Sequence, residues 1–110
     1  MTNISGLDAP APSLTEDQVR LALRRVRDPE LNLNIVDLGL VYAIRVDGGK
    51  VEVDVSLTSP GCPSGAEILK SAEEEVKATE GVESAVINLV WSPPWTPERI
   101  EPRVRAYLGF

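Results

Sequence analysis

The sequence predicts an α+β fold: a two-layer α-β-β-α-β sandwich with a small three-stranded mixed sheet and a proline-rich C-terminal tail. Two segments, near 16–27 and 63–79, repeat apolar residues with the period of a helix. Segment 51–57 alternates apolar and polar residues, as a half-buried strand does. The chain has 110 residues, 43% hydrophobic and 25% charged, and this composition is typical of one globular domain.

The first predicted helix spans about 16–27. Thr15 and Gln18 fit a capping box, in which each side chain bonds the backbone of the other residue. Apolar residues follow at positions i, i+3, i+4 and i+7: Val19, Ala22, Leu23 and Val26. The helix is expected to end at Asp28, because Pro29 disfavours a helical conformation in the residue before it.

Two antiparallel strands are expected next, over Leu40–Val46 and 51–57. They are joined by Asp47-Gly48-Gly49-Lys50, and glycine supplies the positive φ that tight hairpin turns need. The second strand is expected to bury one face, which carries Val51, Val53, Val55 and Leu57.

A second helix is predicted over 63–79, and Gly81 follows it as a C-cap glycine would. Its apolar stripe consists of Ala66, Ile68, Leu69, Ala72 and Val76. A third strand is predicted over Val82–Trp91, with Ala85, Ile87, Leu89 and Trp91 on one face.

The tail after Trp91 is rich in proline, so it is not expected to extend the sheet. Its prolines are Pro93, Pro94, Pro97 and Pro102. Thr96 and Pro97 suit the N-cap and first position of a helical turn, and Pro102 is expected to divide the tail into two short turns.

Residues 1–13 contain Gly6, Pro10 and Pro12 and no periodic pattern, so a flexible leader is expected ahead of a single domain over 14–110. The start lacks the basic region and apolar core of a signal peptide. No apolar run approaches the roughly 20 residues that span a bilayer. We therefore expect no membrane partner and a cytoplasmic location.

The charge balance argues against nucleic acid as a partner. The formal net charge is −6, whereas nucleic-acid binding depends on neutralising phosphates. One basic cluster falls on the first predicted helix and consists of Arg20, Arg24, Arg25 and Arg27. It is interpreted either as a solvated face or as a contact for an acidic partner.

Cysteine and histidine usage limits the chemistry most. The chain has one cysteine, Cys62, and no histidine, so it cannot form an internal disulfide, a zinc finger or a Cys-His catalytic pair. Any metal held tightly by sulfur must be shared with another molecule. A thiol enzyme is not expected, since no histidine base is present.

Cys62 lies in the loop Ser59-Pro60-Gly61-Cys62-Pro63. Pro60 and Gly61 suit a type II turn and Pro63 suits the first helical position, which puts Cys62 at or near a helix N-cap, where a thiolate is favoured. Alternatively, Cys62 is a small buried residue that fills space. Thr58 and Ser59 either hydrogen-bond a ligand or cap the turn.

Three acidic residues stand near turns. Asp28 and Glu30 lie in the connection after the first helix, and Asp37 precedes the first strand. Ordinary turn chemistry explains such residues, because Asp forms side-chain turns. If they instead surround Cys62, they disfavour its thiolate while the helix end favours it, and the sequence leaves this balance open.

Four motifs together resemble those of the PaaD and SufT-like metal-sulfur cluster assembly family. They are Asp28–Glu30, Asn34–Tyr42, Leu57–Pro63 and Trp91–Pro97, in order between about residues 15 and 100. The sequence has neither the cysteine-rich extension of PaaD nor the P-loop of carrier ATPases that contain this domain. The resemblance is therefore to the free-standing SufT-like form.

This resemblance implies the α-β-β-α-β fold, a role in making or delivering iron-sulfur clusters, and a pocket around a reactive cysteine. The pocket residues of the family match Cys62, Asp28, Glu30, Thr58 and Ser59, with Asp37 adjacent in its own motif.

The leading hypothesis is a carrier or maturation factor for a transient iron-sulfur cluster. Such clusters take about four thiolates, so one Cys62 per chain requires ligands from outside. These would come from a second copy of the chain in a homodimer, from small thiols, or from cysteines of a scaffold or client apoprotein. The carboxylates of Asp28 and Glu30 are candidate oxygen ligands for iron.

A second hypothesis is an adaptor that binds the cluster machinery or its clients and holds no cluster. Trp91, Trp95 and the proline-rich tail would supply the contact surface, because exposed aromatic residues anchor interfaces. The alternative for both indoles is that they close the open end of a small core.

Overall fold

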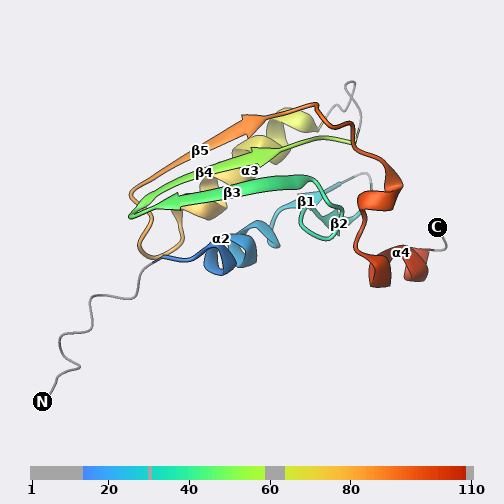
Figure 1. Ribbon diagram of the computed structural model, residues 1–110, viewed down its shortest axis with the longest axis horizontal. Helices are drawn as coiled ribbons and strands as arrows, with labels where there is room; N and C mark the ends of the chain where they lie inside the picture. Colours follow the sequence, from blue (N-terminus) through green and yellow to red (C-terminus); the bar gives the residue numbers. More distant parts are fainter. Residues whose placement is uncertain (1–13, 30, 59–63, 109–110) are drawn as a thin grey trace, which may run out of the picture.

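The structure is a computed structural model and describes residues 14–29, 31–58 and 64–108 (Figure 1). The leader expected over 1–13 lies outside the described residues. The elements are α2 (Glu16–Leu23), β1 (Arg27–Asp28), β2 (Leu33–Asn34), β3 (Val41–Asp47), β4 (Lys50–Val55), α3 (Gly65–Lys77), β5 (Ser84–Leu89), the 3₁₀ turn η1 (Pro97–Arg99) and α4 (Pro102–Leu108).

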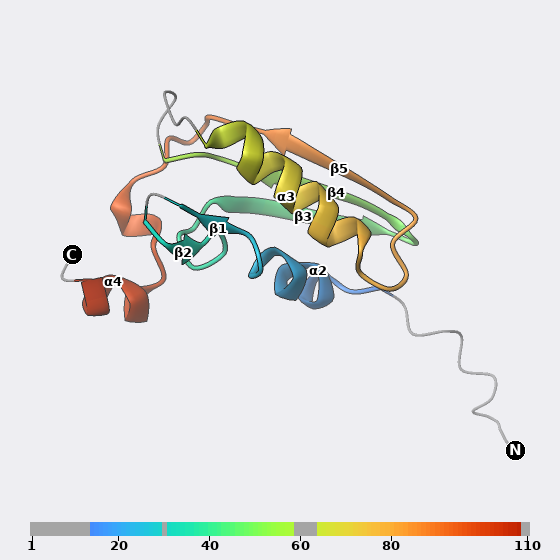
Figure 2. The same cartoon turned by 180° about the vertical axis from the view of Figure 1, so that it is seen from behind.

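The main sheet has the strand order β3-β4-β5. β3 and β4 pair antiparallel, whereas β4 and β5 pair parallel because α3 connects them. Helices α2 and α3 cover the same face of this sheet (Figure 2). The expected α-β-β-α-β sandwich with a mixed three-stranded sheet is confirmed.

The core fills the space between the sheet and these two helices. The apolar residues of β4 face inward as their alternation predicts, and Val51, Val53 and Val55 are buried. They form one cluster with residues of α2 and α3, which are Val19, Leu23, Ile68, Ala72 and Val76. Each fully buried valine or leucine contributes roughly 1.5–3 kcal/mol through removal of apolar surface from water.

The first helix is shorter than predicted, because the chain turns at residues 24–25 and enters a small second sheet at Arg27. α2 ends at Leu23, and β1 pairs antiparallel with β2. Val26 is buried as its spacing predicts, but it lies between the end of α2 and β1, and its carbonyl accepts a hydrogen bond from the Ile35 amide at 2.9 Å. Pairing with the returning chain therefore replaces the last helical turn, and this hairpin was not predicted.

The other boundaries differ by a few residues. The buried stripe of α3 consists of Gly65, Ile68, Ala72 and Val76, whereas the predicted Ala66 is exposed. β5 ends at Leu89 rather than Trp91, and both of these residues are exposed. The predicted inward face of this strand is therefore buried only at its beginning, where α3 covers it.

The opposite face of the sheet carries a polar network. Arg45 donates to both carboxylate oxygens of Asp54, at 2.7 and 3.0 Å, and to Glu52 at 3.1 Å. The Asn88 amide donates to the same two carboxylates. These bonds lower the pKa of the Glu52 and Asp54 carboxyls, first through Arg45 and then through Asn88. Because this face is open to water, the network contributes little to stability.

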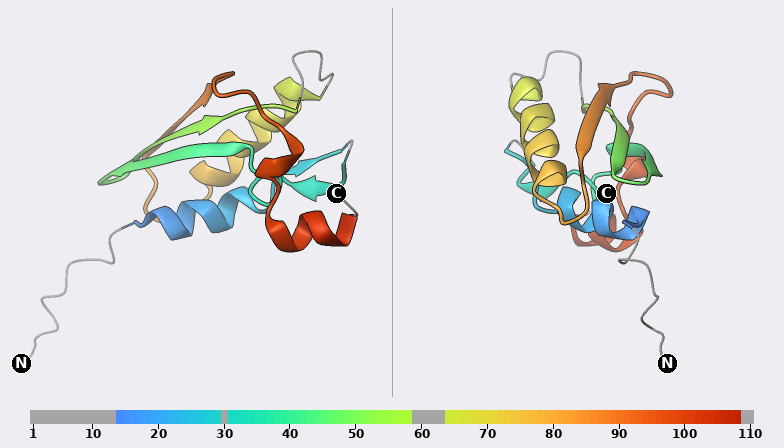
Figure 3. Two further views of the ribbon diagram at one scale, coloured as in Figure 1. Left: turned by 45° about the vertical axis from the view of Figure 1, so that its right-hand side comes forward. Right: turned by 90° about the vertical axis from the view of Figure 1, so that its left-hand side faces the viewer.

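The C-terminal tail folds back onto the turn between β2 and β3 (Figure 3). The Trp95 indole N–H donates to the Leu38 carbonyl at 2.6 Å, and Ile100 is 1% exposed. The Tyr42 hydroxyl donates to the Pro93 carbonyl at 2.7 Å. Trp95 therefore packs against the core, which agrees with the interpretation that the indoles close it. Trp91 does not, since it is 44% exposed.

The two short turns expected in the tail are confirmed. Thr96 is the N-cap of η1 and Pro97 occupies its first turn. Pro102 begins α4, where its missing amide hydrogen costs no helical bond.

The tail requires a glycine at position 39. Gly39 has φ +75°, and a Cβ atom there would lie 2.1 Å from the Arg99 carbonyl oxygen. We expect Gly39→Ala to lower the free energy of unfolding by about 3 kcal/mol, through backbone strain and the clash with the tail. Urea denaturation measures this change.

Gly48→Ala is the matched control. Gly48 has a similar φ of +61° but open space around it, so only the strain of about 1 kcal/mol is expected. Equal losses in the two variants would show that the tail does not press on the turn at Gly39.

Candidate functional site

The segments that carry the predicted site residues lie at one end of the molecule. The β1–β2 hairpin, the carboxyl end of β4 and the amino end of α3 share this end in both views (Figures 1 and 2). Asp28, Asp37 and Thr58 belong to the described residues, whereas Glu30, Ser59 and Cys62 lie outside them.

Asp28 is the last residue of β1 and its exposed fraction is 1%. The sequence suggested a loop carboxylate, and this expectation was wrong because β1 pairs with β2. The Asp28 carbonyl accepts a hydrogen bond from the Asn32 amide at 2.7 Å, and Asn32 adopts the positive φ of 56° that closes the hairpin. A carboxylate is thus held in a buried strand, where desolvation makes it costly without polar contacts.

Asp37 joins three parts of the chain. Its carboxylate accepts hydrogen bonds from Arg24 at 2.5 Å and from the Asn34 side chain at 2.9 Å, while its amide donates to Asn34 Oδ1 at 2.8 Å. Its carbonyl accepts from the Glu101 amide at 2.8 Å. The carboxylate that the resemblance associated with the pocket therefore ties the end of α2 to the turn after β2.

Arg24 and Asn34 were missed as partners of Asp37. The spacing of Asn34 and Asp37, three residues apart before a glycine, is a signal for a side-chain turn that identifies one of them. Arg24 has no such signal, because it comes from a helix ten residues before Asn34.

Hydroxyl groups follow the end of β4. Thr58 is half-buried, whereas Ser56 is fully buried. The Ser56 amide donates to the Leu40 carbonyl at 2.8 Å, but its Oγ has no hydrogen-bond partner in the part of the chain that the structure describes. Sequence reasoning missed Ser56, because the alternation of 51–57 assigns it to the polar face together with Glu52 and Asp54.

The amino end of α3 packs closely against the end of β4. α3 begins at Gly65 with Ser64 as its N-cap, two residues later than the predicted start at Pro63. A Cβ atom on Gly65 would lie 2.7 Å from Leu57 Cδ1, so glycine permits this approach. The chain on both sides of 59–63 is therefore anchored in the core.

The described residues alone do not assemble a metal site. Residues 14–29, 31–58 and 64–108 contain no cluster of three or more His, Cys, Asp or Glu side chains suited to a metal ion. Within the same residues, none of the helices has the length and apolar character needed to cross a bilayer.

Comparison with known proteins identifies relatives over most of the chain. The family described as iron-sulfur cluster assembly protein matches residues 16–88. The Fe-S protein maturation auxiliary factor SufT of Staphylococcus aureus is 41% identical over 85 residues, which cover 76% of this chain and 97% of that protein. An iron-sulfur cluster carrier protein of Synechocystis is 36% identical over 81 residues, which cover 74% of this chain and 23% of that protein.

A solved structure has the same fold. The crystal structure of DUF59, a domain of unknown function from Bacillus anthracis, superposes with a TM-score of 0.82 at 33% sequence identity. The match covers 86% of this chain and 92% of that one.

The contacts of Asp37 predict a structural cost for its removal. We expect Asp37→Ala to lower the free energy of unfolding by about 2 kcal/mol, because two hydrogen bonds to its charge are lost. Arg24→Ala should cost about 0.5–1 kcal/mol, since this ion pair is partly exposed. Urea denaturation of both variants and of the double variant measures the coupling, and strictly additive losses would contradict the contact.

Proposed function

Because the chain belongs to the iron-sulfur cluster assembly protein family, we propose that it binds an iron-sulfur cluster as transient cargo and delivers it to apoproteins. The relatives named as a maturation auxiliary factor and as a cluster carrier support this role. The structural observation that carries the proposal is the buried Asp28 carboxylate, at the end of the molecule where β4 stops and α3 begins.

Cys62 is the proposed attachment point of the cluster. A thiolate bonds iron directly, and the carboxylates of Asp28 and Glu30 are the proposed oxygen ligands or proton acceptors beside it. Thr58 and Ser59 would donate hydrogen bonds to cluster sulfides. Delivery is then a ligand exchange: a client cysteine forms a bond to iron, the bond from Cys62 to iron breaks, and the proton of the client thiol passes to the released thiolate.

The ligand count requires a second molecule. One chain offers one cysteine and no histidine, whereas a cluster takes about four such ligands. We propose that the cluster bridges two copies of the chain, with small thiols or client cysteines completing the set. The same incompleteness favours release, because a cluster held by few protein bonds exchanges readily with a client that offers a full set.

An adaptor that holds no cluster is the second candidate function. Leu89 and Trp91 favour it, because these two residues are 39% and 44% exposed at the end of β5. Exposed aromatic and apolar residues anchor protein contacts. Anaerobic reconstitution with iron and sulfide separates the candidates, since only the carrier retains both elements after desalting.

Cys62→Ser tests the attachment point. We expect this variant to keep the thermal unfolding midpoint of the parent and to lose cluster retention and transfer to an apoprotein, because a serine hydroxyl does not replace the thiolate. Iron and sulfide analysis after desalting measures retention. Ser84→Ala, at the far end of β5, is the control and should retain the parent's iron. Unchanged transfer by Cys62→Ser would refute the proposed role of the thiol.

Cluster loading should also change the oligomeric state. Since a bridging cluster binds the dimer and not the monomer, it shifts the population towards dimer by mass action. We expect anaerobic sizing chromatography to show a larger dimer fraction after reconstitution than in the apo protein. A monomer that retains a stoichiometric cluster without added thiol would contradict bridging.

A further inference from the structure

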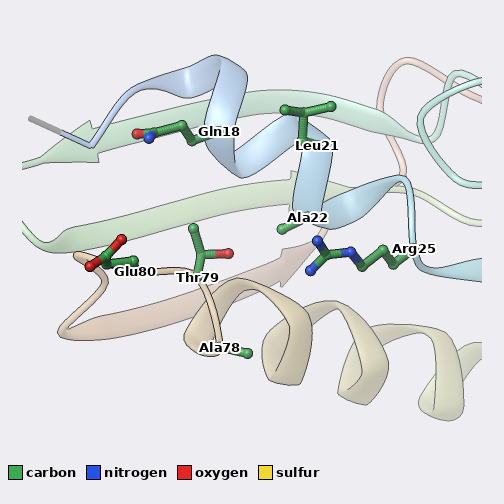
Figure 4. Close-up of a pocket in the computed structure, with 7 residues that line it drawn as sticks. All are labelled: Gln18, Leu21, Ala22, Arg25, Ala78, Thr79 and Glu80. Carbon is green, nitrogen blue, oxygen red and sulfur yellow. The ribbon is translucent and has the colours of Figure 1, made fainter. Parts of the chain in front are cut away.

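The exposed side of α2 carries two adjoining hollows that share one apolar side chain. The first, of about 280 Å³, lies between α2 and the chain after α3 (Figure 4). Its lining residues are Gln18, Leu21, Ala22, Arg25, Ala78, Thr79 and Glu80. The second, of about 270 Å³, is lined by Asp17, Arg20, Leu21 and Arg24. Leu21 forms the ridge between them and is 63% exposed.

Leu21 is not explained by the core. The buried residues of α2 are Val19, Ala22 and Leu23, so Leu21 lies on the side of the helix that faces water. Such an exposed leucine beside two hollows offers apolar area to a partner without disturbing the fold.

The arginines around Leu21 differ in the ion pairs and hydrogen bonds that their side chains make. Arg24 is held by Asp37, and Arg25 makes one long ion pair of 3.7 Å with Glu75 while its side chain stays 69% exposed. The Arg20 side chain makes no hydrogen bond or ion pair with any residue that the structure describes, although its carbonyl accepts a hydrogen bond from the Arg24 amide. Figure 4 shows the Arg25 guanidinium turned towards the space between α2 and α3. Positive charge is thus available on both sides of the leucine.

The lining of the two hollows has a small excess of positive charge, unlike the whole chain. Three arginines (Arg20, Arg24 and Arg25) and two acidic residues (Asp17 and Glu80) line them, whereas the formal net charge of the chain is −6. A polyanion such as nucleic acid or an anionic membrane would be repelled by the rest of the chain. A short peptide segment meets only the local charge, and it can supply an apolar side chain as well.

We propose that this face of α2, the Leu21 surface, docks an acidic segment of a partner protein. An apolar side chain of that segment packs against Leu21, and acidic side chains on either side of it pair with Arg20 and Arg25. None of the predicted site residues that the structure describes lines either hollow, although Arg24, which lines the second, pairs with Asp37. A partner held there is therefore expected to leave the end that carries β1 and the start of α3 accessible. Docking requires no cluster, and its test is therefore independent of the proposed carrier function.

The test uses the full-length apo protein and a synthetic peptide. The peptide has 12 residues, with one central leucine between two pairs of glutamates. Titration followed by ¹H-¹⁵N NMR is expected to give saturable shifts at the amides of Leu21, Ala22 and Ala78. A peptide with serine in place of the leucine should bind at least about tenfold more weakly, and one with lysines in place of the glutamates should not bind.

Variants of the protein give the second arm. Leu21→Ser and Arg20→Ser should each weaken the parent peptide about tenfold, and neither removes a buried contact. Val86→Ser, at an apolar residue that is 53% exposed on β5, and Arg103→Ser on α4 are the controls and should bind as the parent does. Circular dichroism confirms that each variant folds.

Three results would overturn the proposal. The affinity for the parent peptide could be unchanged by Leu21→Ser and Arg20→Ser, or the NMR shifts could spread over arginines outside α2. The third is that the same shifts arise when the protein is concentrated without peptide. The last result would assign the Leu21 surface to a second copy of the chain.

Discussion

The turn at residues 34–39 is held from three directions, and the arrangement of the rest of the chain depends on it. The Asp37 carboxylate accepts hydrogen bonds from the Arg24 side chain at the end of α2 and from the Asn34 side chain in β2. The Asp37 carbonyl accepts one from the Glu101 amide in the tail. Charged hydrogen bonds of this kind are stronger than neutral ones. The end of α2 and the tail, two segments distant in sequence, thus meet at one residue of the turn between β2 and β3.

The same turn explains why the tail is folded rather than extended. Trp95 donates its indole hydrogen to Leu38, and the Arg99 carbonyl approaches Gly39 so closely that no side chain fits between them. The Arg99 guanidinium also lies 4.4 Å from the centre of the Tyr42 ring, a cation–π distance. The tail therefore covers the core beside the turn that precedes β3.

The proposed carrier function and the proposed docking surface place different demands on the fold. The end that carries the predicted site residues combines a buried carboxylate, the β1–β2 hairpin and the junction of β4 with α3 (Figure 1). The Leu21 surface lies on the outer side of α2, and Leu21 itself is not among the buried residues of that helix. A protein that delivers a cluster benefits from this separation, because a partner is then held without blocking the end from which the cluster leaves.

The sequence by itself determined the fold class, the two main helices, the hairpin of β3 and β4, and the divided tail. These follow from local rules: apolar period, glycine in the turn, and proline at helix starts. It also limited the chemistry. With one cysteine and no histidine, any metal held tightly by sulfur would need ligands from another molecule. Cys62, Ser59 and Glu30 remain predictions from the sequence and the resemblance.

Only the tertiary structure decided how distant segments pair. Val26 has helical spacing but lies beyond the end of α2, where its carbonyl accepts a hydrogen bond from the Ile35 amide that the local sequence does not reveal. The sequence indicates a turn at Asp28, which is buried at the end of β1, and it gives no sign that Asp37 bonds Arg24. The spacing of apolar residues along the sequence indicates which residues are buried. The backbone conformation at those residues depends instead on hydrogen-bond partners that the fold brings together.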